Sequence, residues 1–231
     1  MSTLAGTGQP LKLPYVDLHL YTDDGRHVGM NYAIGQFENQ NLIADASGNQ
    51  INGQEWIVTP VSTPGSHFIV SDLPAVQFLQ TYPSLQSALG TSDTVEIVGV
   101  GAPAGGAPVY TSPTTVNMVT GSFLEVPVSV LQNPDGSINL ILGQATVTID
   151  SLISELDSYN GIGAIKTTDA YQGLRDKLVS AKNSIKQGMN NTARNQLHAY
   201  QNQLSADNLV TPYARTAMLD DSQSLIDSIS R

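Results

Sequence analysis

Cysteine is absent from this chain of 231 residues, which excludes disulfide bonds, thiol catalysis and cysteine-based zinc sites together. Basic side chains are almost absent from residues 1–149, where Lys12 and Arg26 stand against eleven acids and leave a net charge of −9. Residues 150–231 carry eight basic and nine acidic side chains, a net charge of −1. Because such a surface repels phosphates and anionic lipids, we expect no nucleic acid partner.

Long apolar runs are also missing. No run approaches the ~18 residues that a membrane-spanning helix needs, so we expect no transmembrane segment. The first 15 residues have neither a basic region nor an apolar region of the kind that a signal peptide carries. A polar surface with few charges is typical of exported β proteins. We therefore expect an extracellular or cell-surface location, with the export signal removed from the sequence as it stands.

Strand patterns fill residues 1–149. Val16, Leu18 and Leu20 alternate with polar residues, which is the period of a strand with one buried face. Asp24-Gly25 and Asp135-Gly136 are hairpin signals, because glycine adopts positive φ at little cost. Many short strands joined by Gly- and Pro-containing turns predict an immunoglobulin-like β-sandwich domain over 1–149, with a short helical insertion near 72–90.

The period changes to that of helices over residues 150–231. Apolar residues recur there at spacings of three and four, and they predict four amphipathic helices packed as a bundle. Candidate N-caps are Asp150, Thr168, Asn190 or Asn191, and Thr211. Gly188 is placed as the residue that follows a helix end. The chain is therefore expected to be α+β overall, with a second domain over 150–231.

This second part resembles a known family. The segment from Asn190 to Leu204 reads NNTARNQLHAYQNQL, and it is similar to the most specific block of the FIMAH-type helical module. That module stands at the C-terminus of many secreted and cell-wall-associated prokaryotic proteins. Gln201 stands where the family often has Ile, and Asn208–Val210 replaces a Lys-rich connection. The resemblance implies an appended structural module without catalytic residues. The N-terminal part loosely resembles β-sandwich modules of prokaryotic surface proteins.

No catalytic motif is recognisable. The G-x-S-x-G elbow is missing, and the Gly-rich stretch 99–106 has no Lys for a phosphate. The candidate paired carboxylates stand in no motif, and we expect them to be solvent-facing strand residues: Glu38, Glu55, Glu96 and Glu125. Asp17 and His19 share one strand face, which suits either a metal or a polar outer face. We therefore expect a protein that is not an enzyme.

The best candidate ligand is calcium. The segment 45–55 places oxygen-bearing side chains at relative positions 1, 3 and 5, and an acid ten residues after the first. Calcium takes six to eight oxygen ligands and accepts such loops. The expected ligands are Asp45, Ser47, Asn49 and Glu55, with Asp23 or Asp24 added from the first hairpin. The alternative is a polar loop in which Asn and Gly serve the turn alone.

Two function classes remain. The first is a non-catalytic surface protein that associates with itself or with another cell-surface protein through the β domain. Its strand edges lack the lysines that usually guard against pairing, and residues 1–14 could donate a strand to a neighbour. The alternative is a carbohydrate- or calcium-binding module of a larger secreted protein. Its candidate platforms for sugar rings are Tyr15, Tyr21, Tyr32, Tyr82 and Tyr110.

Overall fold

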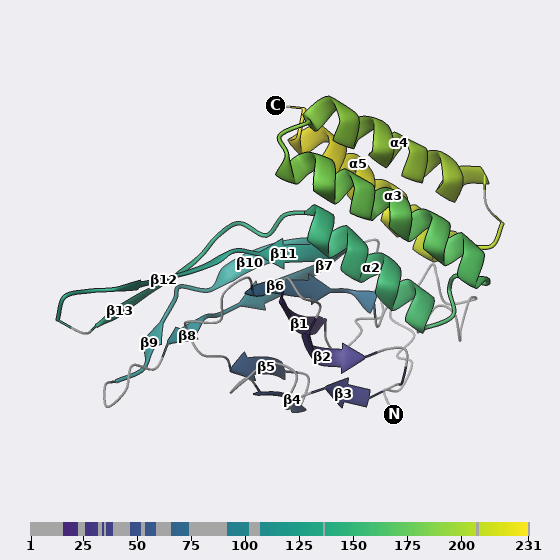
Figure 1. Cartoon of the computed structure of the whole chain (residues 1–231). Coiled ribbons are helices and arrows are strands. Elements are labelled where there is room, and N and C mark those ends of the chain that lie inside the picture. Colours follow the sequence, from purple (N-terminus) through teal and green to yellow (C-terminus); the bar gives the residue numbers. More distant parts are fainter. Residues whose placement is uncertain are drawn as a thin grey trace.

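The structure is a computed structural model, and its described residues combine antiparallel strands with four α-helices. It describes residues 16–22, 26–31, 34, 36–38, 47–51, 54–58, 66–73, 92–101, 107–135, 137–206 and 208–230. The α+β composition and the order of strands before helices are as the sequence predicts. In Figure 1 the helices lie together at one side of the strands, with α2 nearest to them.

Strands occupy the first part of the chain. They are β1 (Asp17–Thr22), β2 (His27–Asn31), β3 (Gln36–Glu38), β4 (Ser47–Ile51), β5 (Gln54–Val58), β6 (Ser66–Ser71), β7 (Ser92–Ile97), β8 (Val100–Gly101), β9 (Val109–Tyr110), β10 (Thr114–Val119), β11 (Phe123–Val126), β12 (Val128–Gln132) and β13 (Ile138–Leu142). The helices follow as α2 (Ile149–Gly161), α3 (Thr168–Lys186), α4 (Asn190–Ala206) and α5 (Pro212–Ser228).

Both predicted hairpins are confirmed. β1 pairs with β2 around Asp24-Gly25, and β12 pairs with β13 around Asp135-Gly136. In the second turn the Asp135 carboxylate accepts hydrogen bonds from the backbone N–H and the hydroxyl of Ser137, at 2.9 and 2.6 Å. A short acidic side chain that bonds the backbone two residues ahead stabilises such a turn. Local turn chemistry therefore stabilises the second connection.

Among the described strands, the largest sheet has five in the order β11-β6-β1-β2-β3. Its two faces pack against different partners. On one face Val70 and Val126 form a cluster with Val116 and Met118 of β10, and residues of β7 pack against this cluster. On the other face Ile69 and Phe123 join the helices in the largest apolar cluster. The sheet is therefore covered on both faces, as the alternation of side chains along a strand allows.

The helices follow the predicted apolar periodicity. The expected stripes on all four helices are buried or partly buried, from Leu152 in α2 to Ile229 just after α5. Two predicted N-caps are wrong. α2 is capped by Thr148 instead of Asp150, and α3 by Thr167 instead of Thr168. In both places the threonine with extended backbone, one residue before the helix, accepts the hydrogen bond from the first turn.

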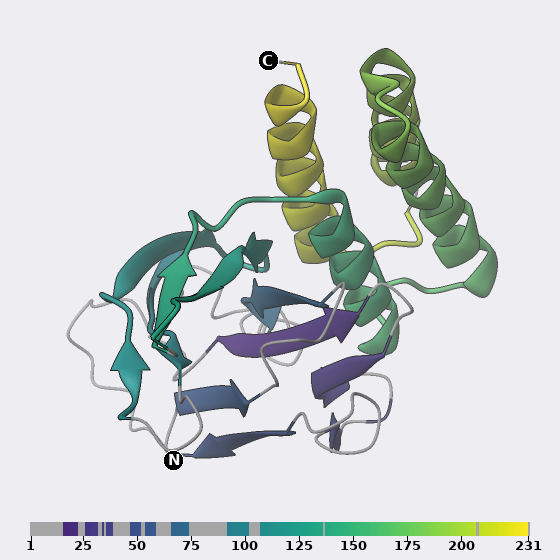
Figure 2. The same ribbon diagram turned by 60° about the vertical axis from the view of Figure 1, so that its left-hand side comes forward.

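The start of α5 and the end of α3 agree with the sequence, whereas α4 begins with Asn190 as its first helical residue and not as its N-cap. Thr211 precedes α5 with Pro212 in the first turn, although its side chain makes no capping bond. Gly188 has φ of +70° directly after the C-cap of α3, so it occupies the left-handed position that glycine favours. Figure 2 shows α3 and α4 as a closely packed pair. Pro212 at the start of α5 and Gly188 after the end of α3 therefore occupy the positions that their backbone preferences favour.

One apolar cluster crosses the predicted boundary between residues 149 and 150. It contains Ile69, Leu73 and Phe123 from the strand part together with the buried faces of all four helices. The hydroxyl of Tyr159 in α2 donates to the carbonyl of Gly121 at 2.8 Å. The boundary is therefore a change of secondary structure, and the core is shared across it.

Two expected features lie mainly outside the described residues. Leu73 is helical at the start of the expected insertion, and the rest of that insertion falls in the undescribed segment 74–91. The proposed strand donor, residues 1–14, is also outside the described part of the chain. Within the described residues, no helix is both long and apolar enough to cross a membrane.

Candidate functional site

The polar face of β1 is buried. Interpreting Asp17 and His19 as a polar outer face is wrong, because both side chains are buried in the fold. They lie on the sheet face that carries Ile69 and Phe123, which is the face that packs on the helices. The alternation of apolar and polar residues in β1 thus separates two buried faces, one apolar and one polar.

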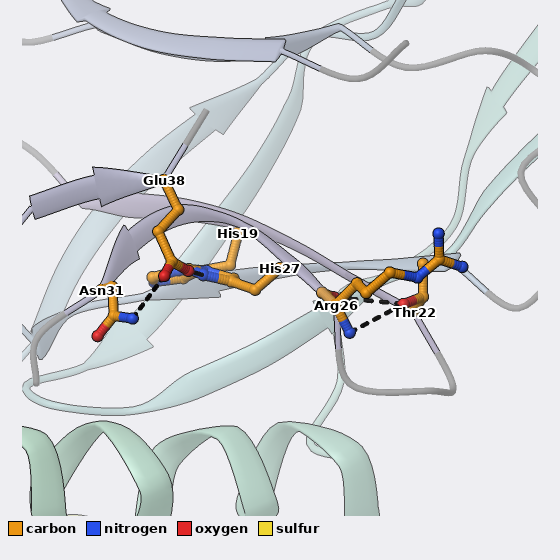
Figure 3. Close-up of polar contacts among 6 residues, drawn as sticks. All are labelled: His19, Thr22, Arg26, His27, Asn31 and Glu38. Atoms are coloured by element: carbon orange, nitrogen blue, oxygen red, sulfur yellow. Dashed lines mark hydrogen bonds and ion pairs between the residues drawn. The ribbon is translucent and has the colours of Figure 1, made fainter. Parts of the chain in front are cut away.

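A chain of hydrogen bonds runs across this face through two histidines (Figure 3). His19 Nδ1 lies 3.0 Å from His27 Nε2, and His27 Nδ1 lies 2.8 Å from Glu38 Oε2. At one end Asn31 Nδ2 donates to Glu38 Oε1 at 2.7 Å, and at the other His19 Nε2 lies 3.1 Å from Ser71 Oγ. Four strands, β3, β2, β1 and β6, contribute to it. The chain begins at the partly exposed Glu38 and ends at a fully buried serine.

Gly29 makes this arrangement possible. It pairs with Glu38 on one side, and the β1–β2 register, continued by one residue, places it beside His19 on the other. A Cβ at Gly29 would lie 2.8 Å from His19 Nδ1 and 2.9 Å from His27 Nε2, and the backbone φ is +138°. The missing side chain thus leaves the space in which the His27 ring meets His19. A side chain there would meet both rings and a strained backbone.

Aromatic rings extend the site along the sheet. Tyr21 stacks on His27 with ring centroids 4.6 Å apart, and His67 stacks on Tyr21 at 6.0 Å. His19 stacks on His27 at 5.2 Å and on Phe123 at 6.3 Å. Next to this stack, the short β1–β2 turn is closed by Thr22, whose Oγ1 accepts from the Arg26 backbone N–H at 3.1 Å (Figure 3). The rings hold the two histidines in a fixed orientation.

Burial determines the protonation of these groups. It lowers the pKa of His19 well below the usual value near 6.5, and the neighbouring His27 lowers it further. Burial also lowers the pKa of His27, although the hydrogen bond to Glu38 opposes this. Asp17 is buried nearby, and burial raises its pKa to about 7. Both histidines are therefore neutral at neutral pH.

These hydrogen bonds connect titratable groups in the order in which a proton can be passed along them. A serine linked through histidine to a carboxylate has the order of groups found in nucleophilic sites. However, Ser71 is fully buried, so its hydroxyl cannot meet a substrate in this conformation. The arrangement can instead move a proton between the partly exposed Glu38 and the interior. No group of three or more His, Cys, Asp or Glu suited to hold a metal occurs within the described residues.

A second buried polar group lies where the helices meet β11. Asp221 of α5 accepts a hydrogen bond from the Phe123 backbone N–H at 3.0 Å, and burial raises its pKa to about 7. Glu155 of α2 is fully buried, and neither carboxylate oxygen has a hydrogen-bond partner in the described part of the chain. Burial, with Asp221 and Asp220 next, raises the pKa of Glu155 well above its usual value. This carboxyl is therefore protonated in the folded protein.

An exposed apolar surface lies on the hairpin β12–β13, which we call the arm (residues 128–142). Figure 1 shows the arm extending away from the helices. The register pairs Ser129 with Ile141 and Leu131 with Asn139, so these four residues share one face. All four are exposed, Leu131 by 55% and Ile141 by 49%. Close to the arm, Val100 and Tyr110 face each other across β8 and β9 and are exposed as well.

The predicted calcium ligands are only partly described. Ser47, Asn49 and Glu55 lie on the β4–β5 hairpin, where Asn49 pairs with Trp56 and Glu55 with Gln50. The other three expected ligands lie outside the described residues: Asp23, Asp24 and Asp45. Calcium binding by these six residues therefore stays a prediction.

Other sequence-based expectations have mixed outcomes. Among the glutamates expected to face solvent, Glu96 is exposed, whereas Glu38 binds His27 and Glu125 accepts a hydrogen bond from Thr148 Oγ1 at 2.6 Å.

Of the expected sugar platforms, Tyr110 is exposed by 66% and Tyr21 lies in the buried ring stack. The other three tyrosines are outside the described residues: Tyr15, Tyr32 and Tyr82.

The sequence did not identify His27, Glu38 or Asn31 as one site with His19. A signal was present, because His27-Val-Gly29 places a histidine and a glycine on one face of a strand directly after the strand of His19. Comparison of the chain with family models, with curated proteins and with solved structures found no match to any of them. The function must therefore be argued from the geometry alone.

Proposed function

We propose that this protein is a non-catalytic interaction protein of the cell surface or extracellular space, which associates with other copies of itself through the arm. The observation that carries the proposal is the exposed face of the arm, where Leu131 and Ile141 are diagonal neighbours. Exposed apolar residues gathered on one face indicate an interaction surface, whereas single scattered ones do not.

The pairing of the arm supports the same function. β12 and β13 form a two-stranded sheet, and neither pairs with a third strand among the described strands. Each strand therefore has an edge whose backbone groups can pair with another chain. A two-stranded hairpin is at best marginally stable by itself, so addition of a further strand would stabilise it.

Charge favours a second copy as the partner. Asp135, in the turn, is the one charged residue in 128–142, and residues 27–165 contain no Lys or Arg. Two such arms can approach each other without strong repulsion, whereas a phosphate-rich or anionic partner would find no complementary charge. The basic residues lie mostly in the helical part, away from the arm.

Finer features of the architecture and the location belong to the same proposal. We propose that the strands form an immunoglobulin-like sandwich, supported by the cluster in which β6 and β11 pack on β7 and β10. The helices are proposed to be a FIMAH-type module, supported by the residues of 190–204. Recovery of the protein from intact producer cells only in the cytosolic fraction would contradict the surface location.

Size-exclusion chromatography with light scattering tests the association. The wild type should gain mass with concentration, and the double variant Leu131→Lys/Ile141→Lys should remain monomeric, because charges on a buried interface are costly. The matched control is Met189→Lys, which places a charge on an apolar residue exposed by 43% on the helical side. A monomeric wild type at every concentration, or equal association of both variants, would contradict the proposal.

A further inference from the structure

Each link of the buried chain from Ser71 to Glu38 holds one hydrogen atom. The Glu38 carboxylate accepts, so His27 Nδ1 carries a proton and donates to it. Neutral His27 must then accept at Nε2, so His19 Nδ1 donates to it, and His19 Nε2 accepts from the Ser71 hydroxyl. The tautomers of both rings follow from the single fact that a carboxylate cannot donate. Every link therefore has one donor and one acceptor when both rings are neutral.

One added proton can be accommodated by this chain. On His27 it forms an imidazolium beside Glu38, an ion pair across 2.8 Å. His27 Nε2 then donates to His19 Nδ1, and His19 Nε2 donates to Ser71 Oγ, so the direction of two links reverses and each still holds one hydrogen. A second proton, on His19, places an N–H on both sides of the 3.0 Å gap between the rings. That contact then has two donors, two positive charges and no acceptor.

The rings cannot easily move apart within the fold. The Gly29 backbone lies directly against the facing nitrogens, and the stacked rings of Tyr21 and Phe123 flank the pair. The pairing of β1 with β2 is shorter than the pairing of β1 with β6. Two residue pairs, Leu20 with Val28 and Tyr21 with His27, are registered between β1 and β2, against six between β1 and β6. Beside these two pairs, the bonds between Thr22 and Arg26 and the contact of Leu20 with Val28, the hydrogen bond between His19 and His27 is a further connection of the β2–β3 hairpin to β1.

We infer that the His19–His27 pair is an acid-sensitive contact, at which uptake of the second proton separates the β2–β3 hairpin from β1 and exposes the edge of β1. The freed strand edge is a surface to which another strand can add. This inference is independent of the arm and of the proposed association. The edge of β1 is thus covered by the β2–β3 hairpin at neutral pH and exposed in acid.

The direction of the pH effect follows from the protonation of the two rings. Their folded pKa values lie below the ordinary value near 6.5, so the folded state resists protons that the unfolded state accepts. The stabilisation is present above that value and is lost as the pH falls below it. The other titratable groups facing the pair act differently. Glu38 holds His27 by hydrogen bond, Tyr21 stays protonated because burial raises its pKa, and Asp17 favours the folded state in acid because burial raises its pKa to about 7.

Hydrogen exchange read by mass spectrometry tests the inference on the whole chain. After correction for intrinsic rates, lowering the pH from 7.5 to 5 should increase exchange in 26–38 at least roughly tenfold, the effect of one pKa unit on a proton equilibrium. Helical peptides from 168–206 should change much less. Unchanged exchange in 26–38 down to pH 4.5, or an equal increase in the helices, overturns the inference.

A variant identifies the groups responsible. His27→Gln keeps an amide that can donate to Glu38 and accept from His19, and it removes one titrating ring. It should remove the acid-induced increase, and the control His198→Gln, at an exposed position on α4, should keep it. If His27→Gln opens in acid as the wild type does, the inference is wrong.

Should His27→Gln fold poorly, the wild type gives the answer by nuclear magnetic resonance of the imidazole protons. His19 and His27 should gain the second proton together with loss of amide protection in β1 and β2. Uptake of both protons while these amides remain protected overturns the inference.

Discussion

Gly29 is the residue on which the buried histidine pair depends. A Cβ at this position would lie within 2.9 Å of both facing ring nitrogens and of the Leu18 carbonyl oxygen. Contacts this short, combined with φ of +138°, leave no low-energy position for a side chain. The requirement for glycine is therefore steric as well as conformational.

We expect Gly29→Ala to lower the free energy of unfolding by roughly 2–4 kcal/mol, from backbone strain and overpacking together. Urea denaturation at pH 7.5 measures the change. The control is Gly188→Ala, which has φ of +70° and no atom within 4 Å of a new Cβ. That variant should lose about 1 kcal/mol, the cost of the left-handed conformation alone. Equal losses in the two variants would show that the contact with the histidines is unimportant.

For single residues, the sequence predicted which side chains share a strand face but not whether that face is buried. The alternation around Asp17 and His19 is local information, and it places the two residues on one face correctly. Whether that face meets water depends on the helices, which are more than 120 residues away in the chain. The pattern of one strand cannot contain that information, so it suits a metal pair or a polar outer face equally well and does not predict a buried polar face. The site with His27 and Glu38 required the register of three strands, which is also non-local.

Helices and hairpins were more predictable than sheet order. The apolar spacing of α2 to α5, the two Asp-Gly turns and Gly188 depend on residues within a few positions of one another. Cap positions were missed by one or two residues, because Thr148 and Thr167 compete with equally suitable neighbours. The order β11-β6-β1-β2-β3 brings together strands separated by long segments, and no local pattern specifies it.

The contact between helices and sheet contains a carboxyl group whose protonation should set the pH dependence of stability. Glu155 is fully buried without a partner in the described residues, and its pKa is raised. A raised carboxyl pKa stabilises the folded state fully below the unfolded value, and this stabilisation is lost as the pH rises through the folded pKa. Above pH ~4.5 the loss amounts to at most about 1.4 kcal/mol per pH unit.

Glu155→Gln should therefore gain stability relative to the wild type as the pH rises from 5 to 8, because glutamine does not ionise. Thermal unfolding by circular dichroism at several pH values measures the difference between the two proteins. Asp176→Asn, at an exposed site on α3, serves as the control and should show no such trend. A constant difference between Glu155→Gln and wild type over this range would contradict the raised pKa, because the carboxyl would then bind the same number of protons in the folded and unfolded states.

For the whole molecule, the separation of charge and of exposed apolar residues suggests a division of roles. The helical part carries most basic residues and contributes most of the shared core, whereas the arm presents Leu131 and Ile141 with one charge in fifteen residues. The sequence predicted that the strand part would associate, from its unguarded edges. The structure adds an exposed apolar face on one hairpin, because exposure on a particular hairpin face requires the three-dimensional arrangement.

The absence of cysteine allows a direct measurement of the association. A single cysteine at Leu131→Cys should form an intermolecular disulfide under mild oxidation, because pairing arms bring this face of two copies together. The matched variant Met189→Cys has its cysteine at a similarly exposed site on the helical side and should stay largely monomeric. Preferential dimer formation by Leu131→Cys, measured on non-reducing gels at several protein concentrations, is the predicted result. Equal and slow cross-linking of both variants would contradict association through the arm.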